Sequence, residues 1–153
     1  MKRIALLAGL AAVAGLAGCF VRTLNLPADF VKVEETYPGP YAVRAISADG
    51  VMIALRTEKN PQNGTLAFWT EAVANQMVSA RGYQAAGNED VTSVADVPGR
   101  LLTFTAQKRG VGFTYVLAVF VQGADILIGE AGGRTDAVQP KLAEVKKALV
   151  SAR

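Results

Sequence analysis

The reactive side chains of this 153-residue chain are few, and their identities restrict the chemistry that it can perform. It has no histidine and a single cysteine, Cys19. The commonest general base and the usual zinc ligands are therefore missing. The Ser-x-x-Lys and Gly-x-Ser-x-Gly patterns of hydrolases and the glycine fingerprints of nucleotide-binding loops are absent as well. We expect no catalytic residues, no cofactor and no bound metal.

The position of Cys19 indicates what its thiol does. It follows an uncharged, apolar run at residues 4–17, which itself follows Lys2 and Arg3. A basic start, an apolar run and small residues before a cleavage point are typical of a secretory signal. At about 1.5 Å per helical residue, the run is too short to cross a bilayer core of about 30 Å. Residues 1–18 are therefore predicted to be a signal peptide.

The tetrapeptide Leu16, Ala17, Gly18 and Cys19 resembles the lipobox of bacterial lipoproteins. The resemblance implies that Leu16, Ala17 and Gly18 are recognised by the signal peptidase. Diacylglycerol is then joined to the Cys19 sulfur, the chain is cut before Cys19, and the new amino terminus is acylated. Two or three acyl chains hold a protein on a bilayer, because each buried methylene contributes about 0.8 kcal/mol. Phe20, a residue other than aspartate, implies the outer membrane under the family's sorting rule.

An ordinary cleaved signal with an incidental cysteine and an uncleaved short anchor are the alternatives. The place of the tetrapeptide at the end of the apolar run, with no second cysteine downstream, favours lipidation of Cys19. The partner implied by this chemistry is a membrane of the bacterial cell envelope, reached through a lipid anchor. With one cysteine, the domain has no internal disulfide, and packing must carry the fold.

The charge of the chain excludes one class of partner. The formal charge of +3 falls to +1 once Lys2 and Arg3 leave with the signal peptide. Nucleic-acid binders usually carry a basic stripe or patch, and no segment of the mature chain has such a density of lysine and arginine. We therefore expect no nucleic-acid partner. The mature length suits one domain with a real core.

The first half of the mature chain is predicted to form a tether, a hairpin and a helix. Residues 19–40, which include several prolines, are predicted to be the lipidated N-terminus and tether, with one short strand around 30–33. The single domain then spans residues 41–153. Strands at 41–47 and 51–56 flank an Asp-Gly turn and predict a β-hairpin. Apolar residues at three- and four-residue intervals predict a helix from Leu66 to Ala80.

The second half is predicted to form strands followed by a C-terminal helix. We expect strands at 91–97, 100–107, 113–121 and 125–130. The third of these is apolar on both faces, as a covered central strand would be. An amphipathic helix follows, with its apolar seam at Val138, Leu142, Val145 and Leu149. It begins near Pro140, or residues 135–139 form an irregular lead-in; periodicity leaves both open.

This order of elements predicts an α+β domain in which an antiparallel sheet is packed by helices. The segments DGVMIALRTEK, GTLAFWTEAV, GRLLTF, GFTYVLAVFV and ILIGEAGG resemble the Mog1/PsbP-like α/β/α sandwich domains of bacterial proteins. The resemblance covers residues 41–151 and rests on element order and apolar pattern. It implies a domain that binds or assembles with other molecules rather than an enzyme.

Several residue groups have side chains that could form a binding site. The acidic pairs Glu34–Glu35 and Glu89–Asp90 lack the spacing of a calcium loop, so we expect solvated loop acids. Gly132 to Thr135 could hold an anion, but a strand-to-helix turn is the favoured interpretation. Trp69 lies on the apolar helical stripe and is expected to pack in the core, while its neighbour Phe68 could contact a ligand.

The sequence therefore predicts a membrane-anchored lipoprotein with a non-catalytic domain in the periplasm or at the cell surface. An unidentified protein is the expected partner of that domain. A carrier of a small apolar ligand is the alternative, suggested by the two apolar faces of residues 113–121. A serine or threonine hydrolase that works without histidine is a third hypothesis, supported only by the presence of hydroxyl side chains.

Overall fold

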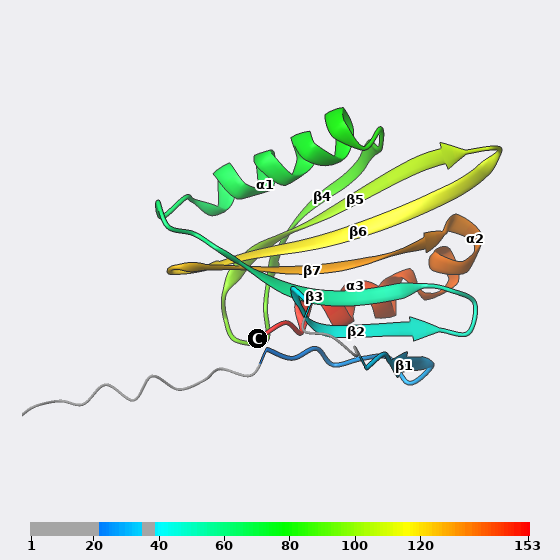
Figure 1. The fold of residues 1–153 in the computed structure, drawn as a ribbon, viewed down its shortest axis with the longest axis horizontal. Helices are drawn as coiled ribbons and strands as arrows, with labels where there is room; N and C mark the ends of the chain where they lie inside the picture. The colour runs from blue at the N-terminus through cyan, green and yellow to red at the C-terminus, as the bar shows by residue number, and fades with distance from the viewer. Residues whose placement is uncertain (1–21, 35–38) are drawn as a thin grey trace, which may run out of the picture.

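The computed structural model describes residues 22–34 and 39–153. Within them, all strands join one antiparallel sheet in the order β1-β2-β3-β7-β6-β5-β4 (Figure 1). The strands are β1 (Phe30–Lys32), β2 (Tyr41–Ser47), β3 (Met52–Lys59), β4 (Gln84–Thr92), β5 (Pro98–Lys108), β6 (Val111–Gln122) and β7 (Asp125–Arg134). The helical elements are α1 (Leu66–Asn75), the π-helical turn η1 (Gln76–Ala80), α2 (Thr135–Val138), the 3-10 turn η2 (Gln139–Lys141) and α3 (Leu142–Val150).

Helices cover both faces of the sheet and give it three layers. On one face, α1 packs over β5 and β6. On the other, α3 packs over β3, β6 and β7. Strand β6 lies between β5 and β7, and its apolar side chains alternate between the two cores. Val116, Ala118 and Phe120 pack on the α3 side, whereas Leu117 and Val119 pack on the α1 side. The prediction of an α+β fold with a covered central strand is confirmed.

The predicted hairpin and first helix are also confirmed. Strands β2 and β3 meet at a turn in which Gly50 has φ of +84°, a conformation that glycine adopts without steric cost. Helix α1 begins after Thr65, whose side-chain oxygen accepts a hydrogen bond from the Phe68 amide at 3.2 Å. The helical segment ends before Gly82, which has φ of +71°.

Strand β4 lies earlier in the chain than the strand that the sequence predicted. The expected strand at 91–97 is instead the end of β4 followed by a turn, because Ser93 accepts hydrogen bonds from the amides of Ala95 and Val97. The strand itself begins at Gln84 and is mostly exposed. It lies at an edge of the sheet, where no alternation of apolar residues is needed. A search for alternating apolar and polar residues therefore does not find strand β4.

The helical C-terminus resolves the alternatives that the sequence left open. Residues 135–139 are a lead-in, made of the short helix α2 and the start of η2, and Pro140 lies in the first turn of η2. The longer helix α3 then begins at Leu142 and buries Val145, Ala148 and Leu149. The apolar seam is the one that the sequence predicted.

The domain begins well before the expected boundary at Tyr41. The backbones of Thr23 and Arg153 exchange hydrogen bonds of 2.9 and 3.3 Å, and Leu24 and Leu26 pack against the core. Strand β1 then pairs with β2 along Phe30–Lys32. Residues 22–32 are therefore part of the folded domain, and the expected tether of residues 19–40 is correspondingly shorter.

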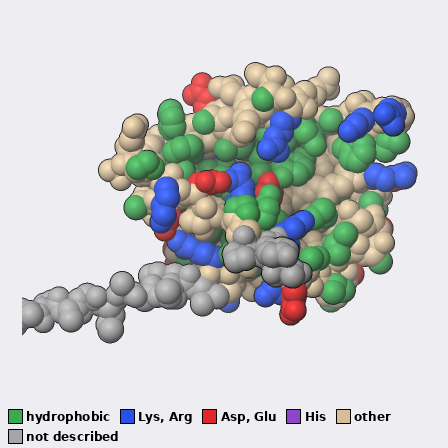
Figure 2. Space-filling model, in the orientation of Figure 1, with side chains coloured by type: hydrophobic (Ala, Val, Ile, Leu, Met, Phe, Trp, Pro, Cys, Tyr) green, Lys and Arg blue, Asp and Glu red, His purple; other side chains and the backbone are tan. Residues whose placement is uncertain are grey.

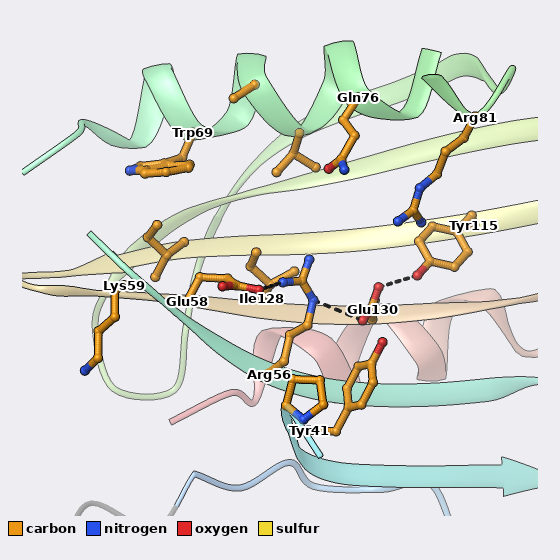
Figure 3. A pocket seen from close by; sticks show the side chains of 14 residues that line it. Tyr41, Arg56, Glu58, Lys59, Trp69, Gln76, Arg81, Tyr115, Ile128 and Glu130 are labelled. Carbon is orange, nitrogen blue, oxygen red and sulfur yellow. Dashed lines mark hydrogen bonds and ion pairs between the residues drawn. The ribbon is translucent and has the colours of Figure 1, made fainter. Parts of the chain in front are cut away.

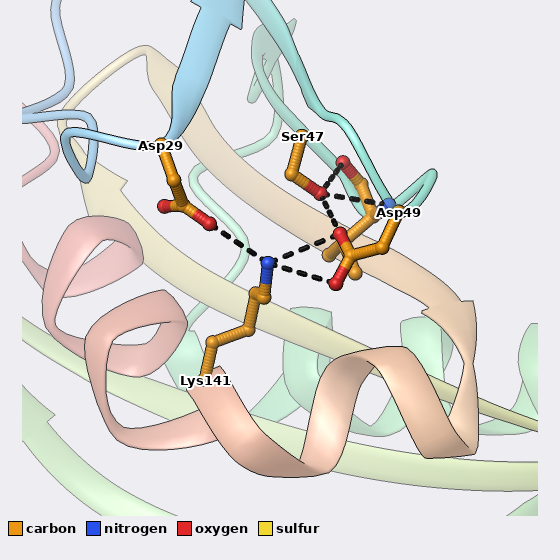
Figure 4. A network of polar contacts seen from close by, with 5 residues as sticks. Asp29, Ser47, Asp49 and Lys141 are labelled. Atoms are coloured by element: carbon orange, nitrogen blue, oxygen red, sulfur yellow. Dashed lines mark hydrogen bonds and ion pairs between the residues drawn. The ribbon is translucent and has the colours of Figure 1, made fainter.

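A polar network ties β1 to the β2–β3 turn and the helical C-terminus (Figure 4). The Lys141 ammonium lies 2.7 Å from a carboxylate oxygen of Asp29 and 3.0 Å from Asp49. Hydrogen bonds from Ser47 and Lys141 lower the pKa of Asp49, and the bonds to Asp29 and Asp49 raise the pKa of Lys141. Asp49 and Lys141 therefore stay charged across the neutral range, and their ion pair persists there.

Candidate functional site

A groove of about 500 Å³ lies between α1 and the half of the sheet formed by β3 and β7 (Figure 3). It exists because α1 packs over β5 and β6 and leaves the α1 side of β2 and β3 uncovered. Figure 2 shows the hollow below α1, with charged side chains set among hydrophobic ones. The lining residues include Tyr41, Arg56, Glu58, Trp69, Gln76, Arg81, Tyr115, Ile128 and Glu130.

The floor of the groove carries a buried carboxylate, Glu130. Its side chain is 11% exposed, and one oxygen accepts a 3.3 Å hydrogen bond from Arg56 Nε. The other oxygen accepts a hydrogen bond from the Tyr115 hydroxyl. Arg56 also donates to Glu58, nearer the solvent. The carboxylate therefore has a donor at each oxygen, as a charge held at a buried position requires. We call Arg56, Tyr115 and Glu130 the floor cluster.

Register explains how distant residues come together in the floor cluster. Arg56 is opposite Ile128 on β7, two residues before Glu130, so both charged side chains point to the α1 side. Tyr115 is opposite Gly132, the next position on that face of β7. A Cβ at Gly132 would lie 2.4 Å from the Tyr115 ring, so glycine is needed there for the ring to lie flat over β7.

A β-bulge brings a second tyrosine to the groove. The register between β2 and β3 shifts between Tyr41 and Val43, so Tyr41 is opposite Arg56 while Val43 is opposite Leu55. Val43 points to the α3 side of the sheet. Because of the extra residue, Tyr41 points to the α1 side instead. Its hydroxyl then lies near Glu130 (Figure 3). Burial and the charge of Glu130 raise the pKa of Tyr41 above its usual value.

The protonation of these groups determines what the groove can do chemically. Burial, followed by the charge of Glu130, raises the pKa of Tyr115 far above that of a free tyrosine. Both tyrosines are therefore neutral hydrogen-bond donors at physiological pH. Neither is activated as a nucleophile, and both oxygens of Glu130 are already engaged. The arrangement presents fixed donors and charges to a bound molecule.

Trp69 and Asn60 shape one end of the groove. The Trp69 indole donates a 3.0 Å hydrogen bond to Asn60 Oδ1, and its ring packs beside Met77 and Ile126 in the α1-side core. Trp69 is thus a packing residue, as predicted, that also lines the groove. Asn60 is 2% exposed and donates to the carbonyls of Gly64 and Gly123. It joins the β3–α1 loop to the β6–β7 turn.

Beyond the groove, the uncovered face continues as an apolar row. Val31, Ile46 and Met52 are successive cross-strand partners on β1, β2 and β3, and Met52 is in turn opposite Gly132 under the Tyr115 ring. These three side chains are 70%, 39% and 38% exposed. The groove and this row together offer polar groups flanked by exposed apolar surface, which is the composition of many protein-binding sites.

The residues that the sequence singled out lie elsewhere. Leu16, Ala17, Gly18 and Cys19 are outside the described residues. Of the acidic pairs, Glu89 pairs with Lys146 and Asp90 with Arg100 at 3.1 Å, while Glu34 is exposed and Glu35 is outside the described residues. Among the residues that the structure describes, no three potential metal-ligating side chains come together.

The Gly132–Thr135 segment is not built as an anion cradle. Strand β7 continues through Arg134, and the helix that follows, α2, has four residues. The Arg134 guanidinium is held by Asp136, with bonds of 3.1 and 2.6 Å. The expected turn is therefore a strand end that passes directly into a helix, and the arginine is already paired.

Phe68 is exposed, as a ligand-contacting residue would be, with 58% of its side chain accessible. Its ring stacks edge-on against Trp69 at a centroid distance of 5.2 Å. It lies outside the groove lining. In the described ranges, no helix has the length and apolar character needed to span a bilayer.

Two solved structures have folds similar to that of this domain. LpqN of Mycobacterium tuberculosis, a protein involved in cell envelope biogenesis, is similar with a TM-score of 0.63 and 19% identity, over 84% of this chain and 79% of LpqN. The cyanobacterial PsbP protein (CyanoP) of Synechocystis sp. PCC 6803 has a TM-score of 0.62 and 11% identity, over 94% of this chain and 98% of CyanoP. No family model and no curated protein sequence matches. The domain thus has the Mog1/PsbP-like α+β fold.

Proposed function

We propose that this protein is an acylated lipoprotein of the bacterial cell envelope whose domain is a non-catalytic binding module. Cys19 carries the lipid, and the groove between α1 and β3 receives a partner protein. The observation that carries the proposal is the floor cluster, a set of paired polar groups around the buried Glu130 carboxylate beneath an open groove of about 500 Å³.

The composition of the groove supports a protein partner. Tyrosine, tryptophan and arginine are the residues that most often dominate binding energy at protein interfaces, and all three line the groove. The floor cluster is held by hydrogen bonds before any partner arrives, so little ordering entropy is lost on binding. The adjoining row of Val31, Ile46 and Met52 provides apolar area that binding would remove from water.

The chemistry of the groove supports a non-catalytic role. The chain lacks histidine, and the two tyrosines nearest Glu130 have raised pKa values that keep them protonated. A general base needs a free acceptor and a nucleophile needs activation, whereas the floor cluster uses its acceptors internally.

The alternative, a carrier of a small apolar ligand, has weaker support. The apolar faces of residues 113–121 that suggested it are filled by packing on both sides of the sheet. The groove is open and its floor is charged, whereas a site for an apolar ligand is enclosed and mostly apolar. Envelope location rests on the lipobox resemblance and agrees with the role of LpqN, which has a similar fold. Phe20 after the lipidated cysteine favours the outer membrane.

A photo-crosslinking experiment in the native cells tests the groove as the binding surface. A benzophenone amino acid at Gln76, an exposed residue of the groove lining, is expected to form a discrete protein adduct. The same probe at Gln139, an exposed residue of η2 beyond the opposite face of the sheet, serves as the matched control and is expected to form none.

A charge reversal then tests whether the adduct depends on the groove itself. Arg81→Glu changes an exposed cation of the groove and is expected to reduce the Gln76 adduct several-fold, because the partner must meet the charge pattern there. Lys108→Glu, an equal charge change at an exposed position on β5, should leave it unchanged. Adducts of equal yield at Gln76 and Gln139 would contradict the proposal.

A further inference from the structure

The first described residue, Arg22, is fixed to one end of the sheet. Its guanidinium donates to Gln122 at 2.7 Å and to Asp125 at 3.3 Å, on either side of the β6–β7 turn. The next residue, Thr23, pairs its backbone with Arg153. The chain therefore enters the domain beside the C-terminus, as Figure 1 shows, and the Arg22 side chain reaches the β6–β7 turn.

Several loops meet at this end of the sheet. The amide of Asn60 donates to the carbonyl of Ala124 at 2.8 Å, which joins the β3–α1 loop to the β6–β7 turn. We call Arg22, Thr23, Asn60, Gly123, Ala124 and Arg153 the entry end. At the opposite end of β3 and β7 lies the β2–β3 turn, with Ala48 exposed. The eight paired residues of β3 separate the two ends by about 25 Å.

The entry end lies a short covalent distance from the proposed lipid. Only Phe20 and Val21 stand between Cys19 and Arg22. Three residue steps of about 3.3–3.6 Å reach at most about 11 Å, which is less than half of the separation of about 25 Å between the two ends of β3. We propose that the acylated protein lies directly on the bilayer, with the entry end against the lipid headgroups. This inference rests on the proposed acylation of Cys19.

The surface on either side of the entry end fits a lipid surface. Phe68, in the first turn of α1 beside Gly64, is 58% exposed, and Val94, whose amide donates to the carbonyl of Val150, is 53% exposed. Apolar side chains of this kind are stabilised at the boundary of headgroups and acyl chains. Arg22 and Lys59 share the acid Asp125, and Arg153 adds a further cation whose guanidinium donates to the Thr23 hydroxyl. The side chains at the entry end therefore have more positive than negative charges, which also favours anionic headgroups.

This orientation determines how the groove faces its partner. Trp69 and Lys59, which line the groove, lie towards the entry end, and the groove runs from there between α1 and the sheet (Figure 3). It therefore opens sideways along the membrane surface. A partner reaches it from within a few tens of ångströms of the bilayer.

Fluorescence quenching by lipid tests the orientation. Because Cys19 is the only cysteine and is acylated, an introduced cysteine provides a single free thiol. A fluorophore is placed at Ala124→Cys or at Ala48→Cys, both exposed turn positions. The acylated protein is reconstituted into phosphatidylethanolamine–phosphatidylglycerol vesicles that carry a nitroxide on the headgroup. We expect quenching several-fold stronger at position 124 than at position 48.

A linker variant provides the control. About 12 glycine and serine residues inserted after Val21 add a reach of about 20 Å, which frees the domain from the surface. This variant should still float with the vesicles but lose the difference between the two positions. Equal quenching at both positions in the protein without the linker, with flotation intact, would overturn the orientation and leave the anchor standing. Loss of flotation would overturn the acylation, and the orientation with it.

Discussion

Replacing Cys19 with alanine is expected to move the protein from the membrane fraction to the soluble fraction. Without the thiol, no diacylglycerol can be attached, and the apolar run of residues 4–17 is too short to span a bilayer by itself. Two or three acyl chains give stable anchoring where one gives marginal binding, so their loss should release nearly all of the protein. Fractionation followed by immunoblotting measures the effect.

The matched control for this variant is Phe20→Ala. It alters the neighbouring side chain and leaves the thiol in place, so the protein should remain with the membrane. An unlipidated Cys19→Ala protein that fractionates as the wild type does would contradict the anchoring proposal. Membrane association would then come from the folded domain.

Replacing Glu130 with alanine is expected to cost about 3 kcal/mol of the free energy of unfolding. The change leaves Arg56 Nε and the Tyr115 hydroxyl without their acceptor, while Arg56 Nη1 keeps its bond to Glu58. Removing one partner of a buried ion pair costs about 3–5 kcal/mol, and the lower value applies because Arg56 is 23% exposed. Urea unfolding monitored by Trp69 fluorescence measures it.

Two further variants separate the buried pair from the exposed one. Glu58→Ala removes another carboxylate that accepts from Arg56, but this side chain is 50% exposed, so the expected cost is about 0–1 kcal/mol. The double variant Arg56→Met with Glu130→Leu removes both charges together and should recover most of the stability lost in Glu130→Ala. A cost for Glu130→Ala no larger than that for Glu58→Ala would contradict the floor cluster as a buried unit.

Much of the fold follows from local pattern. The Asp-Gly turn, the apolar stripe of α1 and the two-faced apolar strand β6 each depend on neighbours within a few residues, and each is confirmed. Strand β4 could not be found in this way. Its sequence, QAAGNEDVT, is polar because it forms an exposed edge, and it is held as a strand by pairing with β5 rather than by its own propensity.

The candidate site could not be predicted because it is assembled by register. Arg56 and Glu130 are 74 positions apart in the chain, and only the pairing of β3 with β7 brings them together. The bulge that turns Tyr41 into the groove leaves no clear mark in the sequence. One signal was available. Glu130 is a lone charge within the apolar run of β7, and a charge at a covered position requires a partner.

The docking of the N-terminal segment onto the domain could not be predicted for a related reason. Its prolines and mixed composition are typical of a tether, but Thr23, Leu24 and Leu26 find their partners at the far end of the chain. Contacts of such long separation have no local signature. Together with the proposed acylation of Cys19, this docking is the basis for the proposed orientation of the domain on the bilayer.

Intact-mass analysis of the protein extracted from the membrane fraction tests the acylation of Cys19. We expect a chain that begins at Cys19, with a mass increased by diacylglycerol and an amino-terminal acyl group on that residue. A mature chain that carries an unmodified Cys19 thiol would contradict it.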